Sequence, residues 1–183
     1  MRKAVTRGLL IAALFVLTAC FASDGPLFST SQAAYPLGTV TRYVHYDHGE
    51  TGAAHDWKKS YSGTITLGDD RTYTDTHYDG KDDIATIFTL YAVGDGYYIV
   101  ADLSDAGTSG EIYYDLLKLE GKTAYLFGLD CVDIDEATLK SNGIGAPDED
   151  GFCTATSLDG LVATFKAMRA DAPAPSEKYE LGG

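Results

Sequence analysis

The stretch SYSGTITLGDDRTYTDTHY, residues 60–78, decides the architecture that we expect for this chain. Its first half alternates between two kinds of side chain, with serine and threonine on one side. The other side carries Tyr61, Gly63, Ile65 and Leu67. A period of two residues is typical of a half-buried β-strand, because successive side chains point to opposite faces. The turn GDD then leads into a second segment of this kind, so the stretch predicts an antiparallel hairpin.

Strand-like segments continue on both sides of this hairpin. They lie at residues 39–46, 84–93, 97–103, 111–120 and 122–130. Short glycine-containing turns, GDG and EG, connect several of them directly, which is a hairpin signal. About seven strands therefore follow one another with no helix between them. This order predicts a mainly β (α+β) fold, in which an antiparallel meander forms a curled sheet or a small barrel.

The pattern becomes helical after the last of these strands. Asp133 can cap a first helix that ends at Gly143. A second helix is indicated by Leu158, Leu161, Val162, Phe165 and Met168, which recur at helical spacing. Thr156 or Ser157 can cap its start. We therefore expect one or two C-terminal helices, with an apolar stripe that covers one face or the mouth of the sheet.

A short apolar run, LLIAALFVLTAC at residues 9–20, follows a basic head at the start of the chain. The run is too short to span a bilayer, and its length is typical of the hydrophobic region of a secretory signal. Its last four residues, LTAC, resemble the lipobox of bacterial lipoproteins, which signal peptidase II cuts just before the cysteine. The resemblance implies a signal peptide at residues 1–19 and fatty acyl chains, such as palmitate, on Cys20. An ordinary signal peptide cut near Ala22 and an uncleaved anchor are the alternatives.

The same resemblance implies a location and a domain organisation. In these lipoproteins the residue after the cysteine influences sorting, and Phe21 is not the aspartate that is associated with inner-membrane retention. The implied location is the cell envelope, with the protein lipid-anchored to the outer membrane and facing the periplasm. Residues 20–38 are then expected to form a lipidated tether and residues 39–170 the β-rich domain with its helices. Residues 171–183 are expected to be a flexible Pro/Ala tail.

Three cysteines leave one thiol unpaired in an exported protein. Lipidation of Cys20 removes this anomaly, and Cys131 and Cys153 then form one disulfide in a compartment where disulfides persist. Closing that loop stabilises the fold by about 3 kcal/mol in the chain-entropy model. The tyrosine-rich strands, with one cysteine after the last strand and another before the final helix, resemble uncharacterised small bacterial lipoproteins. No activity is attached to that family.

The charge of the chain limits its partners. The formal net charge is −13, from 14 basic and 27 acidic residues in a chain of 183. Without residues 1–19, which hold three basic residues and no acidic ones, 11 basic and 27 acidic residues give −16. Such a surface repels phosphate backbones, so nucleic-acid binding is excluded. A partner selected by charge is a basic protein, a cationic ligand or a divalent metal ion, and otherwise the acidic residues serve solubility.

The segment HYDHGETGAAHDW, residues 45–57, holds the candidate metal ligands. They are His45, Asp47, His48 and His55. Imidazole and carboxylate form the ligand set that zinc prefers, although the spacing matches no helical pair of histidines and also fits a solvated loop. Asp56 completes the cluster. No other cofactor is expected.

Two other features are candidates for binding. The acidic segments at residues 75–83 and 148–150 lack the ligand order of a calcium loop, so they are interpreted as acidic turns. The tyrosine pairs Tyr97–Tyr98 and Tyr113–Tyr114 place one ring on each face of a strand, where rings serve either a ligand platform or cross-strand packing.

No catalytic motif is present, since nucleophile-elbow and phosphate-loop patterns are absent from the sequence. The sequence therefore predicts a membrane-anchored, exported lipoprotein of unknown specific activity, acting as a non-catalytic binding or envelope-accessory protein. Three alternatives stay open: an acidic inhibitor or interaction module for a basic protein, a metal-dependent hydrolase that uses the cluster from His45 to Asp56, and a structural spacer.

Overall fold

A computed structural model describes residues 21–48, 56–104, 110–149, 151–169 and 174–182 of the chain. The seven segments with strand-like periodicity all form strands. These are β2 (Val40–His48), β3 (Trp57–Leu67), β4 (Tyr73–Tyr78), β5 (Asp83–Gly94), β6 (Tyr97–Asp102), β7 (Ile112–Glu120) and β8 (Thr123–Phe127). The other elements are β1 (Phe21–Ser23), η1 (Cys131–Asp133), α1 (Glu136–Ser141), β9 (Cys153–Thr154), α2 (Leu158–Met168) and β10 (Glu177–Gly182).

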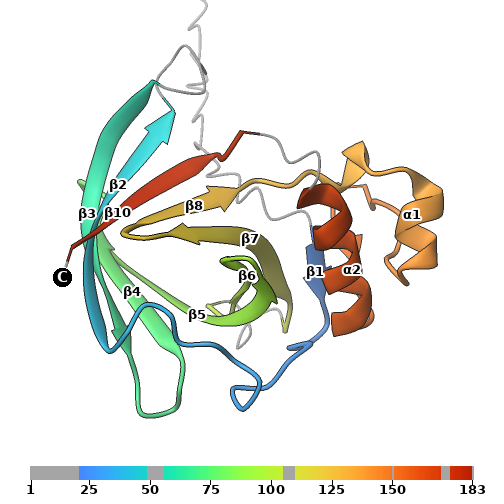
Figure 1. The fold of residues 1–183 in the computed structure, drawn as a ribbon, viewed down its shortest axis with the longest axis horizontal. Coiled ribbons are helices and arrows are strands. Elements are labelled where there is room, and N and C mark those ends of the chain that lie inside the picture. Colours follow the sequence, from blue (N-terminus) through green and yellow to red (C-terminus); the bar gives the residue numbers. More distant parts are fainter. Residues whose placement is uncertain (1–20, 49–55, 105–109, 150, 170–173, 183) are drawn as a thin grey trace, which may run out of the picture.

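The strands close into an eight-stranded antiparallel barrel (Figure 1). Each strand from β2 to β8 pairs with the next one along the chain, which confirms the predicted meander. β10 fills the place between β8 and β2 and pairs with both. Of the two architectures left open by the sequence, the structure has the small barrel. Because the barrel is closed, each of these eight strands has a hydrogen-bonded neighbour on both sides.

The prediction of a flexible C-terminal tail is wrong for residues 174–182, the part of the tail that the structure describes. β10 pairs with β2 along its whole length, from Glu177 opposite Asp47 to Gly182 opposite Arg42. Its first four residues also pair with β8. Tyr179 and Leu181 pack against the interior of the barrel. The segment carries few apolar residues, so its periodicity is weak, and the two neighbouring strands supply the hydrogen bonds that make it a strand.

The prediction that residues 21–38 form a tether outside the folded domain is also wrong. β1 pairs antiparallel with β7 and parallel with β9, and Phe21 is fully buried. Further along, the Ala34 amide donates to the Leu90 carbonyl, and Leu37 packs into the interior of the barrel. The folded domain therefore includes residues 21–38, because their few large apolar side chains fill gaps in two cores.

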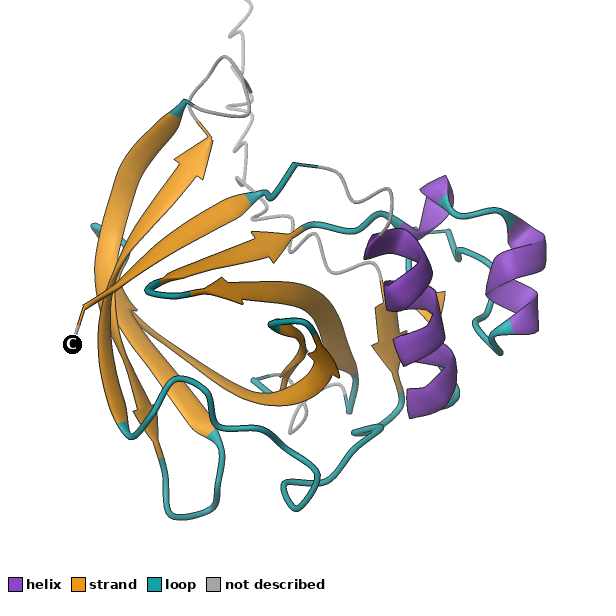
Figure 2. Ribbon diagram, in the orientation of Figure 1, coloured by secondary structure: helices purple, strands orange, loops and turns teal. Residues whose placement is uncertain are grey.

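A second core lies outside the barrel, between its wall and the helices (Figure 2). Outward-facing residues of β6 and β7, among them Ile99 and Leu116, meet Phe165 and Leu161 of α2 in this core. The rings of Phe21 and Phe165 make an edge-to-face contact with centroids 5.1 Å apart. The helix thus covers the outside of the barrel wall.

The helix caps partly follow the sequence. Ser157 caps α2, and its side chain accepts a hydrogen bond from the Gly160 amide, as one of the two predicted caps. Asp135, rather than the predicted Asp133, caps α1 by accepting from the Thr138 amide. Asp133 instead lies in the η1 turn, so the helix begins later than expected. No helix among the described residues is both long enough and apolar enough to cross a membrane.

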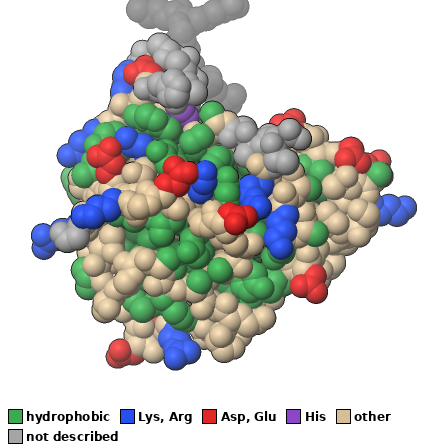
Figure 3. Space-filling model, in the orientation of Figure 1, with side chains coloured by type: hydrophobic (Ala, Val, Ile, Leu, Met, Phe, Trp, Pro, Cys, Tyr) green, Lys and Arg blue, Asp and Glu red, His purple; other side chains and the backbone are tan. Residues whose placement is uncertain are grey.

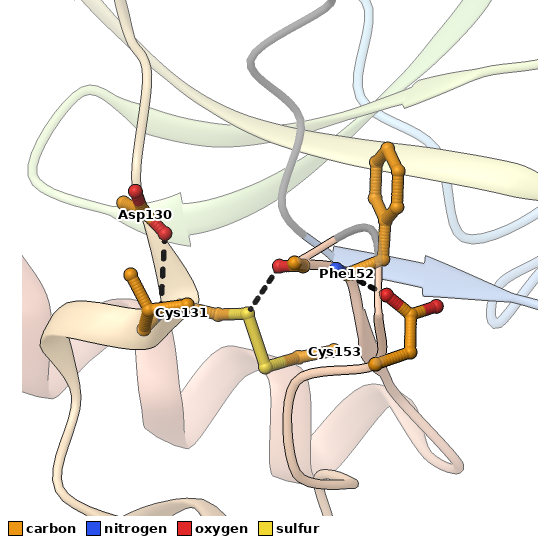
Figure 4. Close-up of a disulfide and its surroundings, with 7 residues drawn as sticks. Asp130, Cys131, Phe152 and Cys153 are labelled. Carbon is orange, nitrogen blue, oxygen red and sulfur yellow. Dashed lines mark hydrogen bonds between the residues drawn. A yellow bond between two sulfur atoms is a disulfide. The ribbon is translucent and has the colours of Figure 1, made fainter.

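The predicted disulfide between Cys131 and Cys153 is confirmed (Figure 4). It joins η1 to β9 with a Cα–Cα distance of 6.2 Å, and both residues are fully buried in the outer core. The bond therefore fixes the helical segment against β1 and the barrel wall, instead of closing an exposed loop.

Candidate ligand-binding site

The interior of the barrel contains a cavity of about 260 Å³. Side chains alternate between inside and outside along each strand, and some of the inward-facing residues of the meander line this space. The apolar part of the wall comprises Leu37, Ile65, Phe88, Leu90, Val100, Leu117, Ala124, Leu126 and Leu181. The interior of an eight-stranded barrel is wide enough either to be filled by side chains or to hold one small ligand.

Acidic side chains line the cavity together with this apolar wall. They are Asp75, Asp102, Asp115 and Glu177. These four residues come from four strands, and no lysine or arginine is among the lining residues. The cavity therefore combines apolar walls with an uncompensated set of carboxylates.

Tyr43, Asp75 and His77 form the first hydrogen-bonded group in the cavity. The Tyr43 hydroxyl donates to both carboxylate oxygens of Asp75, at 2.7 and 2.8 Å, and His77 Nδ1 lies 3.0 Å from Oδ2. Burial, and next the hydrogen bond to Asp75, raise the pKa of Tyr43 far above its usual value. Gly63 on β3 makes room for this group, since a Cβ there would overlap with the Tyr43 ring. The Asp75 carboxylate is thus held by Tyr43 of β2 and by His77 of its own strand, β4.

His45, Glu177 and Tyr179 form the second group. His45 Nε2 lies 3.0 Å from Glu177 Oε2, and the Tyr179 hydroxyl donates to the same oxygen. Burial opposes ionisation of Glu177, but the hydrogen bonds from His45 and Tyr179 outweigh it and hold the pKa below its usual value. Glu177 is thus an ionised carboxylate whose donors come from the protein itself.

A stack of three rings connects the two groups. The Tyr61 ring lies between His45 and His77, with centroids 4.3 Å and 4.1 Å away and interplanar angles of 24° and 15°. The rings come from the adjacent strands β2, β3 and β4. Burial and the nearby carboxylate charges raise the pKa of Tyr61, so its hydroxyl is neutral. The stack therefore connects the hydrogen-bonded groups around Asp75 and Glu177 through ring contacts across β2, β3 and β4.

Asp115 differs from the other carboxylates. It lines the cavity, yet no described residue donates a hydrogen bond to its side chain or forms an ion pair with it. Burial, together with the charges of Glu177 and Asp102, raises the pKa of Asp115 to about 7. Asp115 is therefore poised between its neutral and ionised forms near neutral pH, and its oxygens are available to a ligand.

The structure separates the residues of the predicted metal cluster. His45 and Asp47 are neighbours, with His45 Nε2 3.5 Å from Asp47 Oδ1. His48 lies apart from them, stacked on Trp57 at 4.3 Å with its Nε2 2.6 Å from the Pro175 carbonyl. His55 is outside the described residues. Within the part of the chain that the structure describes, no three His, Cys, Asp or Glu side chains are placed to hold a metal ion. The metal site stays a prediction.

The tyrosine pairs are used for packing. Tyr98 packs against the core inside the barrel, whereas Tyr97 packs against the outer core. Tyr114 is buried in the outer core, and its neighbour Tyr113 contacts Phe152 with ring centroids 5.5 Å apart. Cross-strand and inter-layer packing, one of the two predicted roles, therefore accounts for these rings.

The acidic turns use their carboxylates locally. Asp79 accepts hydrogen bonds from the amides of Lys81 and Asp82, and Asp148 accepts one from the Phe152 amide. Asp75 and His77, which the sequence placed in the first of these segments, lie in the cavity instead.

The sequence pattern missed most of the cavity residues. Asp115 stands at an inward position of a strand whose neighbouring inward position is Leu117, and Asp102 follows Val100 in the same way. The signal available in the sequence was an acidic residue on the apolar side of an alternating strand. Such a residue indicates a polar interior only if the sheet closes into a barrel, and the alternation does not show whether it closes.

No family model, no curated protein and no solved structure matches this chain. The function is therefore argued from the cavity and the residues around it.

Proposed function

We propose that this protein is a lipid-anchored, non-catalytic binding protein of the cell envelope that holds a small molecule inside its barrel. The observation that carries this proposal is the cavity of about 260 Å³ that inward-facing residues of the barrel strands line. A barrel whose interior serves stability alone is filled by side chains. Here the interior instead brings polar groups from several strands to one apolar space, which is the usual composition of a ligand site.

The position of β1 supports the anchor at Cys20. Phe21 is fully buried against Phe165, and Ala22 is also buried in the outer core region. Cleavage near Ala22 would remove the Phe21 ring from this core, whereas cleavage before Cys20 keeps it. Because Phe21, the residue after Cys20, is buried in the fold, an acylated Cys20 would hold the domain close to the membrane surface, which we propose is the periplasmic face of the outer membrane.

The surface gives less support to recognition of a basic protein. Figure 3 shows acidic and basic side chains interspersed on one face, with apolar and neutral atoms between them. The large apolar side chains exposed among the described residues are scattered over β2, β4, β5 and η1. A protein partner selected by charge would need an acidic patch, and this face offers none.

One observation favours a second function, general acid–base catalysis on a bound molecule. Asp115 combines a pKa of about 7 with free oxygens in a cavity, and these are the properties of a proton-transfer group near neutral pH. Retention of an unchanged ligand over hours supports binding, whereas its conversion supports catalysis.

Filling the cavity tests the proposed function. Ala124 lines the cavity on β8, so Ala124→Leu takes up ligand space, while Ala85→Leu adds the same atoms to an exposed position on β5. We expect saturable binding of a small aromatic probe to the full chain in isothermal titration calorimetry, lost in Ala124→Leu and retained in Ala85→Leu. Equal binding by both variants contradicts an interior site. Intact-mass analysis of protein taken from membranes tests acylation of Cys20, and an unmodified Cys20 contradicts the anchor.

A further inference from the structure

We propose that the ligand of the barrel is an organic cation, an amine or ammonium compound with an apolar body, whose charged head lies against Asp115 between Asp102 and Glu177. This inference rests on the proposed function and adds the chemical class of the ligand. It follows from the distribution of charge along the cavity, from the free Asp115 carboxylate, and from the absence of a metal-binding group among the described residues.

The cavity is polar at one end and apolar at the other. On β6 the inward positions run from Tyr98 and Val100 to Asp102, and on β7 they run from Asp115 to Leu117. The two strands are antiparallel, so the C-terminal end of β6 and the N-terminal end of β7 lie at the same end of the barrel. Glu177 begins β10 at this end as well. The carboxylates thus face one another there, and the apolar side chains occupy the other end.

The four carboxylates differ in the number of hydrogen bonds that they receive from the protein. Asp75 and Glu177 are each hydrogen-bonded by two side chains, and Asp102 accepts one hydrogen bond from the Ser104 amide at 2.8 Å. Asp115 has no donor among the described residues. A half-buried carboxylate without a donor is costly for the protein when it is ionised, and a cationic head that donates N–H groups lowers that cost.

The lining excludes other classes of ligand. An anion would meet four carboxylates and no lysine or arginine. A metal ion needs several close ligands, and the described residues place no three suitable side chains together. A neutral apolar molecule fits the deep end of the cavity but leaves Asp115 unpaired. A small cation with an apolar body satisfies both ends.

The titration of Asp115 makes this binding pH-dependent. The titratable groups that face Asp115 in the cavity are Asp102 of β6, Glu177 of β10, Asp75 and His77 of β4, and the tyrosines of β2, β3 and β10; β8 contributes only apolar residues. Burial, and then repulsion by the charges of Glu177 and Asp102, raise the pKa of Asp115 to about 7. Below that pH Asp115 is neutral in the empty cavity, so affinity for a cation falls as the pH decreases.

Three probes of one shape test the proposal. Phenethylamine is a cation, 2-phenylethanol is neutral and 3-phenylpropanoate is an anion, and all carry the same ring on a short chain. In calorimetric titrations of the full chain at pH 8 we expect phenethylamine to bind about tenfold or more tightly than 2-phenylethanol, as for a hydrogen bond to a charged group. We expect no binding of 3-phenylpropanoate.

Two matched variants locate the charge. Asp115→Asn keeps the shape of the side chain and removes its charge inside the cavity, and Asp83→Asn makes the same change at an exposed position on β5. We expect Asp115→Asn to lose about tenfold or more in phenethylamine affinity and to bind 2-phenylethanol as before. Asp83→Asn should leave both affinities unchanged. Thermal unfolding of each variant shows whether it is folded.

The outcomes separate this inference from the proposed function. Equal affinity for phenethylamine and 2-phenylethanol, or unchanged phenethylamine affinity in Asp115→Asn, overturns the cationic ligand and leaves the binding protein standing. No saturable binding of any probe overturns both. A titration with zinc or calcium chloride that displaces phenethylamine assigns the carboxylates to a metal ion and overturns the organic cation.

Discussion

Replacing Asp115 with asparagine should stabilise the fold, and the gain should depend on pH. Burial and the charges of Glu177 and Asp102 raise the pKa of Asp115 from 3.8 to about 7 in the folded protein. Between pH 4 and pH 7, Asp115 is therefore protonated in the folded protein but ionised in the unfolded chain. Stability from Asp115 is therefore fully present below pH 4 and is lost as the pH rises to about 7.

The magnitude follows from the shift. One unit of pKa corresponds to about 1.4 kcal/mol, so a shift of about three units costs the folded state at most about 4 kcal/mol when Asp115 is ionised. The side chain is only half-buried, and water in the cavity screens part of the charge. We therefore expect Asp115→Asn to raise the free energy of unfolding by about 2–4 kcal/mol at pH 8 and to have little effect at pH 4.

Chemical denaturation at a series of pH values measures this difference. Wild type, Asp115→Asn and the exposed control Asp83→Asn are unfolded in guanidinium chloride at pH 4, 5.5, 7 and 8, with the disulfide intact. Titrating groups far from the substituted residue contribute equally to the three proteins and cancel in the differences, so what remains reports Asp115 and its interaction with Glu177 and Asp102. A gain that is the same at every pH, or a variant less stable than wild type at pH 8, refutes the buried charge on Asp115.

Three further predictions concern the barrel and its disulfide. Tyr43→Phe removes a buried donor to Asp75 and should lower the free energy of unfolding by about 1–3 kcal/mol. Tyr46→Phe removes an exposed hydrogen bond to Glu180 and should leave the stability nearly unchanged. Equal losses in the two variants argue against a structured polar interior. Reducing the Cys131–Cys153 disulfide should lower the free energy of unfolding by about 3 kcal/mol in denaturant titrations, and an unchanged midpoint contradicts its role in the outer core. Truncation after Ser176 removes β10 and exposes the edges of two strands, so thermal unfolding followed by circular dichroism should lose its cooperativity; a sharp transition shows that the barrel closes without β10.

The strands of the meander were predictable because each carries its own signal. Residues 60–67 alternate over a full strand, and a glycine-containing turn follows them. Local sterics and turn chemistry decide such hairpins, so no long-range contact is needed to recognise them. The helix that packs on the barrel was visible for the same reason, from the spacing of Leu158 to Met168.

The strands β1 and β10 were not predictable, because nothing local makes them strands. Both are short, and each takes its hydrogen bonds from strands far away in the sequence, as the pairing of Tyr179 with His45 and with Ala124 illustrates. Their segments were expected to be a tether and a tail. Composition describes a segment alone, whereas strand formation here depends on two neighbours that the fold supplies.

The candidate site was predictable only in part. The cluster at residues 45–57 contains His45, which does lie against the polar end of the cavity, but His48 lies elsewhere. Glu177, the hydrogen-bond partner of His45, is 132 residues away along the chain. A site that gathers one or two residues from each of several strands leaves no compact motif in the sequence.

By itself the sequence determined the repeated hairpins and the capped final helix, since periodicity and turn residues act over short spans. It predicted the Cys131–Cys153 pair only together with the lipobox resemblance, which sets Cys20 apart from the other two cysteines. The tertiary structure alone decided that the meander closes, that both ends of the domain join it, and that four carboxylates share one interior. Closure of the barrel is the physical reason for all three, because it brings the inward side of every strand to a common axis. A carboxylate that would face solvent on an open sheet lies there close to other carboxylates and to the space for a ligand.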